Sequence, residues 1–155
     1  MARVVMTREG LEKLQAELEH LQKIERRDVT AALSHARSLG DLSENAEYHS
    51  AKERQALLES RIRKLQTDIT NADVVDQSQV ARGVAVFGRT VRVKDLAEGT
   101  EETYILVGRH EADFDSGKIS VESPIGKGLL GKKTGDVAVI QVPAGTIRYQ
   151  VLSID

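Results

Sequence analysis

The sequence contains no cysteine, which excludes disulfide bonds, thiolate catalysis and cysteine-ligated metal sites. A cysteine-free chain is also typical of a reducing compartment, and we expect a cytoplasmic protein. An uninterrupted apolar run of about 18 residues is missing, as are the apolar stretch and small-residue cleavage site of an export signal. The sequence therefore predicts no membrane partner.

A large excess of charge of one sign is missing too, because 22 basic residues stand against 24 acidic ones and the formal net charge is −2. This balance argues against a broad basic face for duplex nucleic acid and leaves room for a local basic patch. The chain has no Ser/His/Asp set, phosphate-binding glycine loop or nucleotide fingerprint. Its four histidines are not spaced like a metal cluster.

Glycine and proline are scarce in the first half of the chain. Of 12 glycines, only Gly10 and Gly40 precede residue 83, and both prolines, Pro124 and Pro143, lie beyond it. Because these residues mark turns and break helices, the first half has few turns and the second has many. We therefore predict a helical domain, a linker and a second domain, at residues 1–75, 76–82 and 83–155.

Apolar residues with helical spacing form a seam through the first half. Thr7 is placed to cap a helix that begins near residue 8 and stops at Gly40. The first seam contains Leu11, Leu14, Leu18, Leu21, Ile24, Val29, Ala32, Ala36 and Leu39. A second helix, ending near residue 75, carries a matching seam of Ala51, Leu58, Ile62, Leu65, Ile69 and Ala72. Two such seams bury themselves by folding into an antiparallel coiled-coil hairpin. The pattern alone also fits a dimerisation coiled coil or a spacer.

The bend between the two helices carries the acidic residues Asp41 and Glu44. Their spacing fits a capping box, with Asp41 as the N-cap of the second helix and Glu44 at its third position. If both carboxylates face outward instead, they offer oxygen ligands to a hard cation such as Mg²⁺, whose other ligands come from a second molecule. The nearby basic residues Arg37, Lys52 and Arg54 form either a solvated surface or a small cationic patch for a single strand.

The second half alternates β-branched runs with turn residues. The predicted strands lie at residues 84–87, 90–93, 103–107, 119–121, 137–140 and 147–152. Ser123 and Pro124 are placed to cap and open one short helix, with Gly131 just past its end. We expect a mostly antiparallel sheet with one helix packed on it, so the whole chain is α+β.

The segment Gly40-Asp41-Leu42-Ser43-Glu44-Asn45-Ala46-Glu47-Tyr48 resembles the tip signature of the bacterial GreA/GreB transcript cleavage factors, more closely on the GreA side. Further similar blocks lie at residues 7–14, 36–37, 51–53, 117–125 and 131–136, so the resemblance covers nearly the whole chain. It implies a factor that enters the secondary channel of RNA polymerase when elongation has stalled. There it stimulates the polymerase to cleave its own backtracked nascent RNA, and it is no enzyme by itself.

The resemblance also implies roles for individual residues. Asp41 and Glu44 help to hold a second Mg²⁺ jointly with the polymerase, with none bound in the free protein, and Ser43 is an accessory polar contact. Arg37 and Lys52 match a basic patch that faces the 3′ end of the nascent RNA. The free protein is expected to be a monomer.

The second half is identified by the same resemblance as an FKBP-like domain that docks on the rim of the polymerase channel. The expected docking residues are Ile119, Ser123, Pro124 and Ile125. Prolyl isomerase activity is disfavoured, because this half has too few aromatic residues to line a proline pocket. The alternative within the family is an inhibitor that occludes the channel without promoting cleavage, and the intact Asp-Leu-Ser-Glu tip favours the activating role.

Overall fold

A computed structural model of the chain describes residues 3–76 and 81–155. Contacts between Cα atoms divide the chain into two compact units. The first contains Leu11–Ala72, and the second contains Arg3–Gly10 together with Asp73–Asp155. Each unit has its own set of buried apolar residues, so each is described by itself. No helix among the described residues is long and apolar enough to span a membrane.

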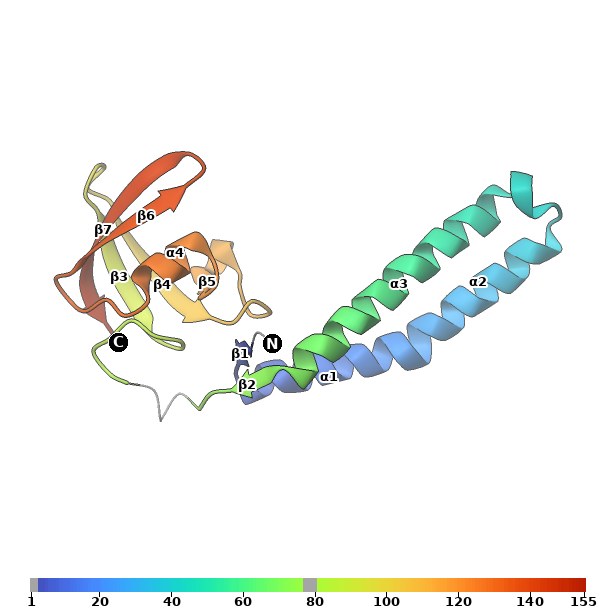
Figure 1. The fold of residues 1–155 in the computed structure, drawn as a ribbon, viewed down its shortest axis with the longest axis horizontal. Helices are drawn as coiled ribbons and strands as arrows, with labels where there is room; N and C mark the ends of the chain where they lie inside the picture. Colours follow the sequence, from blue (N-terminus) through green and yellow to red (C-terminus); the bar gives the residue numbers. More distant parts are fainter. Residues whose placement is uncertain (1–2, 77–80) are drawn as a thin grey trace. The chain divides into compact units, whose positions relative to one another are not determined.

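The first unit is a helical hairpin (Figure 1). Its first limb consists of α1 (Arg8–His20), a π-helical turn (Leu21–Glu25) and α2 (Arg26–Ser38). A short 3-10 helix (Leu42–Glu44) follows the bend, and α3 (Ala46–Thr70) runs back along the first limb. The predicted antiparallel hairpin is confirmed.

The first limb is not one regular helix, and the π turn changes which residues are buried. The backbone N–H of Arg26 donates to the carbonyl of Leu21, five residues earlier. This wider turn rotates the residues after it relative to a regular heptad. Within α2, Leu33, which the predicted seam left out, is buried, whereas Ile24 in the π turn is 45% exposed and Leu39 is 54% exposed. The predicted seam is therefore wrong at these two positions.

The middle of the hairpin is closed by small and branched side chains. Val29, Leu33 and Ala51 form a buried cluster, and Ala32 and Tyr48 pack against it. Ion pairs join the limbs along their length: Arg26 to Glu59 at 2.8 Å, Arg61 to Glu17 at 2.9 Å and Arg54 to Glu25 at 3.4 Å. Because the side chains of these pairs are at least a third exposed, each pair contributes little stability.

The second helix ends earlier than predicted, at Thr70 and not near residue 75. Asn71 closes it, since its N–H donates to the carbonyls of Thr67 and Ile69. The next residues form a short strand, β2 (Ala72–Val74), that pairs with β1 (Val4–Met6). Within the predicted linker, residues 77–80 lie outside the described residues, so its extent stays a prediction.

The second unit is built on a five-stranded sheet. Its strands are β3 (Thr90–Asp95), β4 (Glu101–Val107), β5 (Lys118–Ser120), β6 (Val137–Val142) and β7 (Gly145–Ile154), in the order β5-β4-β3-β7-β6. All neighbours are antiparallel except β4 and β5, which are parallel. The run at residues 84–87 is not a strand and contributes only an isolated bridge from Val84 to Lys133.

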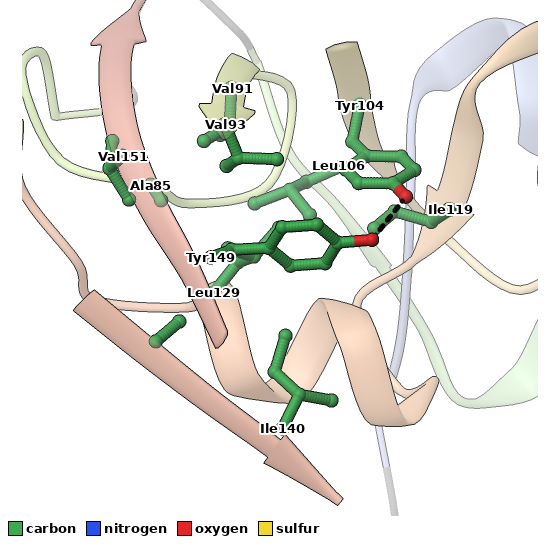
Figure 2. Packing of buried hydrophobic residues seen from close by; sticks show 11 residues of the cluster. Ala85, Val91, Val93, Tyr104, Leu106, Ile119, Leu129, Ile140, Tyr149 and Val151 are labelled. Carbon is green, nitrogen blue, oxygen red and sulfur yellow. Dashed lines mark hydrogen bonds between the residues drawn. The ribbon is translucent and has the colours of Figure 1, made fainter. Parts of the chain in front are cut away.

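One short helix, α4 (Pro124–Leu129), covers the apolar face of the sheet, as predicted. Leu129 of this helix is fully buried among side chains of the sheet (Figure 2). In the same core the hydroxyls of Tyr104 and Tyr149 lie 3.0 Å apart. Burial, together with this hydrogen bond, raises the pKa of Tyr104 well above its usual value. The α+β fold class is confirmed.

Candidate functional site

The chain reverses direction at Gly40. Its φ of +132° lies in a region that residues with a Cβ rarely adopt, so a glycine is required here. Asp41 follows in an extended conformation and begins the 3-10 helix Leu42–Glu44. The sequence of the bend thus places Asp41 and Glu44 at opposite ends of one short turn, and both residues are exposed.

The carboxylate of Asp41 is held by its own turn. Its Oδ1 accepts hydrogen bonds from the backbone N–H of Ser43 at 2.9 Å and from the Ser43 hydroxyl at 3.0 Å. These bonds favour the ionised form and hold the pKa of Asp41 below its usual range. Ser43, expected to be an accessory contact, therefore orients Asp41 and favours its ionised form.

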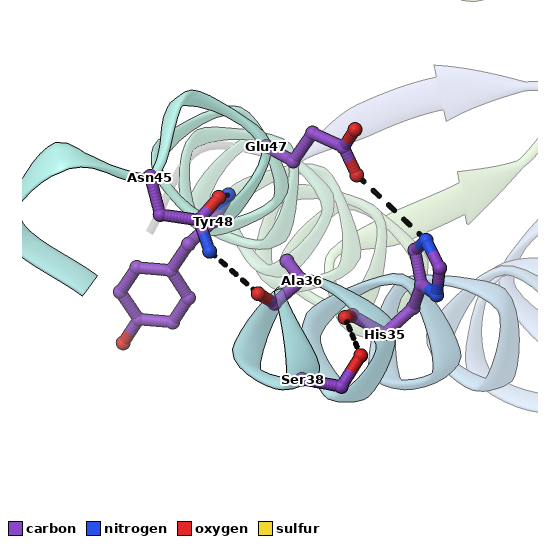
Figure 3. A network of polar contacts seen from close by, with 6 residues as sticks. All are labelled: His35, Ala36, Ser38, Asn45, Glu47 and Tyr48. Atoms are coloured by element: carbon purple, nitrogen blue, oxygen red, sulfur yellow. Dashed lines mark hydrogen bonds and ion pairs between the residues drawn. The ribbon is translucent and has the colours of Figure 1, made fainter. Parts of the chain in front are cut away.

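The predicted capping box is wrong. The N-cap of α3 is Asn45, whose side-chain oxygen accepts from the backbone N–H of Tyr48 at 3.0 Å. The Asn45 amide nitrogen also donates to the carbonyl of Ala36 on α2 at 2.5 Å, so this side chain joins both helices across the bend (Figure 3). Because Asn45 caps α3, Glu44 lies before that helix and Asp41 caps only the 3-10 turn.

The role of Asn45 was missed in the sequence. Asparagine directly before a helical run is a preferred N-cap, but Asp41 three residues ahead of Glu44 gave a stronger pattern. Two histidine contacts were also missed. A ring nitrogen of His49 lies 3.3 Å from the Ser43 carbonyl, and His35 lies 3.9 Å from Glu47.

The predicted basic residues separate into two groups. Arg37 on α2 and Lys52 on α3 each place their charged group 5.9 Å from the centroid of the Tyr48 ring. Arg54 is directed elsewhere, since it pairs with Glu25. Arg37 and Lys52 therefore gather around one aromatic side chain, whereas Arg54 belongs to the ion pairs of the hairpin.

The tip offers part of a cation site. Among the described residues no group of three or more His, Cys, Asp or Glu side chains is placed to hold a metal ion. The two exposed carboxylates are nevertheless the hard oxygen donors that Mg²⁺ prefers, and Mg²⁺ is commonly bound through one or two carboxylates plus ligands from a substrate. Asp41 and Glu44 thus fit a shared site and do not form a complete one.

The expected docking residues lie together in the second unit. Ile119 is 4% exposed and belongs to the core, but it also reaches a surface cavity of about 300 Å³. Ser123, Pro124 and Ile125 line the same cavity. Ser123 additionally caps α4, because its hydroxyl oxygen accepts from the N–H of Gly126 at 3.1 Å. Among the lining residues that the sequence analysis did not select is Phe114, which is 67% exposed.

Replacing Ser43 with alanine is expected to raise the pKa of Asp41 part of the way back to its usual value. The hydroxyl bond is lost while the backbone N–H bond remains. Because the pKa of Asp41 is lower in the folded turn than in the unfolded chain, its ionisation stabilises the folded turn at pH values above the unfolded pKa. That stabilisation is lost as the pH falls through the pKa of the folded state. A carbon-13 NMR titration of the Asp41 carboxylate measures the change. Ser50→Ala, at an exposed serine of α3, is the control, and equal titration curves for the Ser43 variant and the wild type would contradict the assignment.

Comparison with known proteins identifies the family to which the chain belongs. The chain matches the family described as "Transcription elongation factor, N-terminal" over residues 4–74 and the one described as "Transcription elongation factor, GreA/GreB, C-term" over residues 79–155. Transcription elongation factor GreA of Christiangramia forsetii is 52% identical over 148 residues, which are 96% of this chain and 94% of that protein. Transcription elongation factor GreA of Hyphomonas neptunium is 49% identical over 154 residues, 99% of this chain and 98% of that protein.

Among solved structures, the crystal structure of GreA factor homolog 1 of Thermus thermophilus is 29% identical and is matched over 99% of both chains, with a TM-score of 0.46. The sequence matches extend over the helical hairpin, its acidic tip and the sheet unit alike. The chain therefore belongs to the GreA/GreB family of transcription elongation factors.

Proposed function

We propose that this elongation factor inserts its helical hairpin into the secondary channel of RNA polymerase and stimulates cleavage of backtracked nascent RNA. The observation that carries the proposal is the exposure of both tip acids and the favoured ionisation of Asp41. Asp41 and Glu44 are both exposed at the end of the hairpin, and hydrogen bonds from Ser43 orient Asp41 and favour its ionised form. A carboxylate that is exposed, ionised and already oriented loses little freedom when it becomes a ligand.

The reaction is hydrolysis of a phosphodiester within the RNA. A water oxygen bonds to phosphorus while the bond from phosphorus to the 3′ oxygen breaks, so the released fragment keeps a 5′ phosphate. The 3′ oxygen takes up a proton and becomes the hydroxyl from which synthesis resumes. Mg²⁺ bound between the tip and the polymerase would lower the pKa of that water and neutralise charge on the phosphate. Asp41 and Glu44 would contribute two of its ligands, and the polymerase would contribute the others. The chain thus activates the polymerase and does not catalyse cleavage alone.

The positive charges near the tip are suited to binding a nucleic-acid strand beside these acids. Arg37 and Lys52 are exposed basic residues on the two helices that meet at the bend. Cations on these two helices attract the phosphates of the RNA that the polymerase is to cleave. They offset the repulsion that Asp41 and Glu44 alone would exert on a polyanion.

The test is a cleavage time course on a stalled, backtracked elongation complex in the presence of Mg²⁺. Adding the wild-type chain is expected to shorten the RNA from its 3′ end faster than the polymerase does alone. Elongation is then expected to resume when nucleotides are supplied. An unchanged rate of shortening, with the chain bound to the complex, would contradict the proposal and identify an inhibitor that occludes the channel.

Docking on the polymerase is assigned to the cavity formed by the end of β5, the start of α4 and Phe114. Its lining is predominantly apolar, and its exposed aromatic side chain is the type of residue that dominates interface energies. Phe114→Ala is therefore expected to weaken binding to the polymerase about 10-fold. Val139→Ala is the matched control, because Val139 is 55% exposed in the same unit and does not line the cavity. Equal binding by both variants would place the docking surface elsewhere.

A further inference from the structure

Several basic side chains along the hairpin are paired with carboxylates. Arg26, Arg61 and Arg54 pair with glutamates of the opposite limb, and Lys23 pairs with Glu19 one turn away. In each case the positive charge is largely neutralised by its partner. These residues stabilise the hairpin and have little charge left for another molecule.

Arg37 and Lys52 are held in a different way. Each has its charged group 5.9 Å from the centroid of the Tyr48 ring, within the range of a cation–π contact. In the part of the chain that the structure describes, neither makes an ion pair with a carboxylate, although Lys52 also approaches the side-chain oxygen of Gln55 at 3.4 Å. An aromatic ring attracts a cation without cancelling its charge, so both remain available to an anion.

The Tyr48 ring is itself well fixed. The backbone N–H of Tyr48 donates to the side-chain oxygen of Asn45, and the Tyr48 side chain packs against the buried cluster that includes Leu33 and Ala51. His49 makes an edge contact with the same ring, with centroids 5.9 Å apart. Figure 3 shows the ring at the start of α3, beside the side chain of Asn45 that joins the two helices. Because the Tyr48 ring contacts residues of both helices, it can hold the charged groups of Arg37 and Lys52 near the same place.

We infer that Tyr48 is a positioning residue that holds Arg37 and Lys52 ready to bind the phosphates of a single RNA strand next to the acidic tip. The inference deepens the function proposed above and rests on it. Long basic side chains lose conformational entropy when they bind a phosphate, and that loss is smaller for side chains that are already restrained. The ring therefore raises the affinity of the tip for the strand without contributing a charge.

The first arm of the test concerns the free protein and needs no polymerase. Methylene protons of Arg37 and Lys52 that lie near the ring are expected to show upfield ring-current shifts in proton NMR spectra. Tyr48→Leu abolishes these shifts, whereas Tyr48→Phe retains them. Unshifted resonances in the wild type, or shifts that persist in Tyr48→Leu, would overturn the inference whatever the protein does on polymerase.

The second arm measures RNA cleavage by backtracked elongation complexes as the concentration of the full-length factor is varied. Tyr48→Leu is expected to raise the half-maximal concentration about fivefold, with a smaller effect on the maximal rate, and Tyr48→Phe is expected to restore it. Because Tyr48 acts through the two cations, adding Tyr48→Leu to the double variant Arg37→Ala, Lys52→Ala has no further effect. A merely structural role predicts that the two defects multiply.

Two controls make this arm decisive. Arg27→Ala removes an exposed basic residue of the hairpin away from Tyr48 and is expected to leave the half-maximal concentration unchanged. Helical circular dichroism checks that each variant is folded, and Tyr48→Met replaces Tyr48→Leu if the latter is not. If a folded Tyr48→Leu or Tyr48→Met variant had the same half-maximal concentration as the wild type, the inference would be overturned. Absence of any cleavage by the wild type would overturn the proposed function instead, with the NMR arm still deciding the position of the cations.

Discussion

The double variant Asp41→Asn, Glu44→Gln is expected to lose stimulation of RNA cleavage by a factor on the order of 100 or more while it still binds the polymerase. Both substitutions keep the size of the side chain and remove its charge. The asparagine oxygen at position 41 can still accept from Ser43, so the 3-10 turn is expected to persist. What is lost is the ability to supply two anionic oxygens to a divalent cation.

The measurement is the initial rate of RNA shortening at a saturating concentration of factor, with binding to the elongation complex determined separately. Glu53→Gln serves as the matched control, because Glu53 is an exposed acid two turns into α3. Its stimulation should equal that of the wild type. Full stimulation by the double variant would mean that the tip carboxylates do not act in the reaction.

The second large effect is expected from Gly126→Ala, at the start of α4. A Cβ at this position would lie 2.0 Å from the carbonyl oxygen of Ser120 and 2.9 Å from its carbon, and both are backbone atoms. Neither can move away cheaply, since the Ser123 hydroxyl donates to the same Ser120 carbonyl while its oxygen accepts from the N–H of Gly126. The first turn of α4 would have to lift away from the end of β5.

The expected cost is about 3 kcal/mol of the free energy of unfolding of the sheet unit, at the upper end of what overpacking usually causes. Urea unfolding followed through NMR signals of the buried pair Tyr104 and Tyr149 measures it specifically in that unit. Lys127→Ala, at the next residue and exposed, is expected to change stability by less than about 0.5 kcal/mol. A similarly small change for Gly126→Ala would show that α4 is not held against β5 in the way described.

The hairpin was predictable because its sequence repeats an apolar pattern over many turns, and most of those residues are buried or partly buried. Its irregularities were not. The step of five residues from Ile24 to Val29 interrupts the repeat, but only the structure shows that a π turn lies in this interval and that Leu33 is buried. Likewise, β2 was read as helix, because pairing with β1 depends on residues that are about 70 positions away in the sequence.

The tip acids could be selected from their type and spacing, but their geometry could not. Aspartate and asparagine are both preferred N-caps, so local preference alone did not decide between Asp41 and Asn45. The choice depends on the bond from Asn45 to the Ala36 carbonyl on the other helix. The grouping of Arg37 and Lys52 around Tyr48 depends in the same way on how α2 and α3 pack, which sequence spacing does not give.

The central claim is that Asp41 and Glu44 supply ligands to a Mg²⁺ ion shared with RNA polymerase. It is tested most directly by the cleavage rate of backtracked complexes as a function of Mg²⁺ concentration, with the wild type compared to Asp41→Asn at saturating factor. The account predicts that the variant needs at least about tenfold more Mg²⁺ for its half-maximal rate. The same half-maximal Mg²⁺ concentration for both proteins, with only the plateau changed or nothing changed at all, would contradict it.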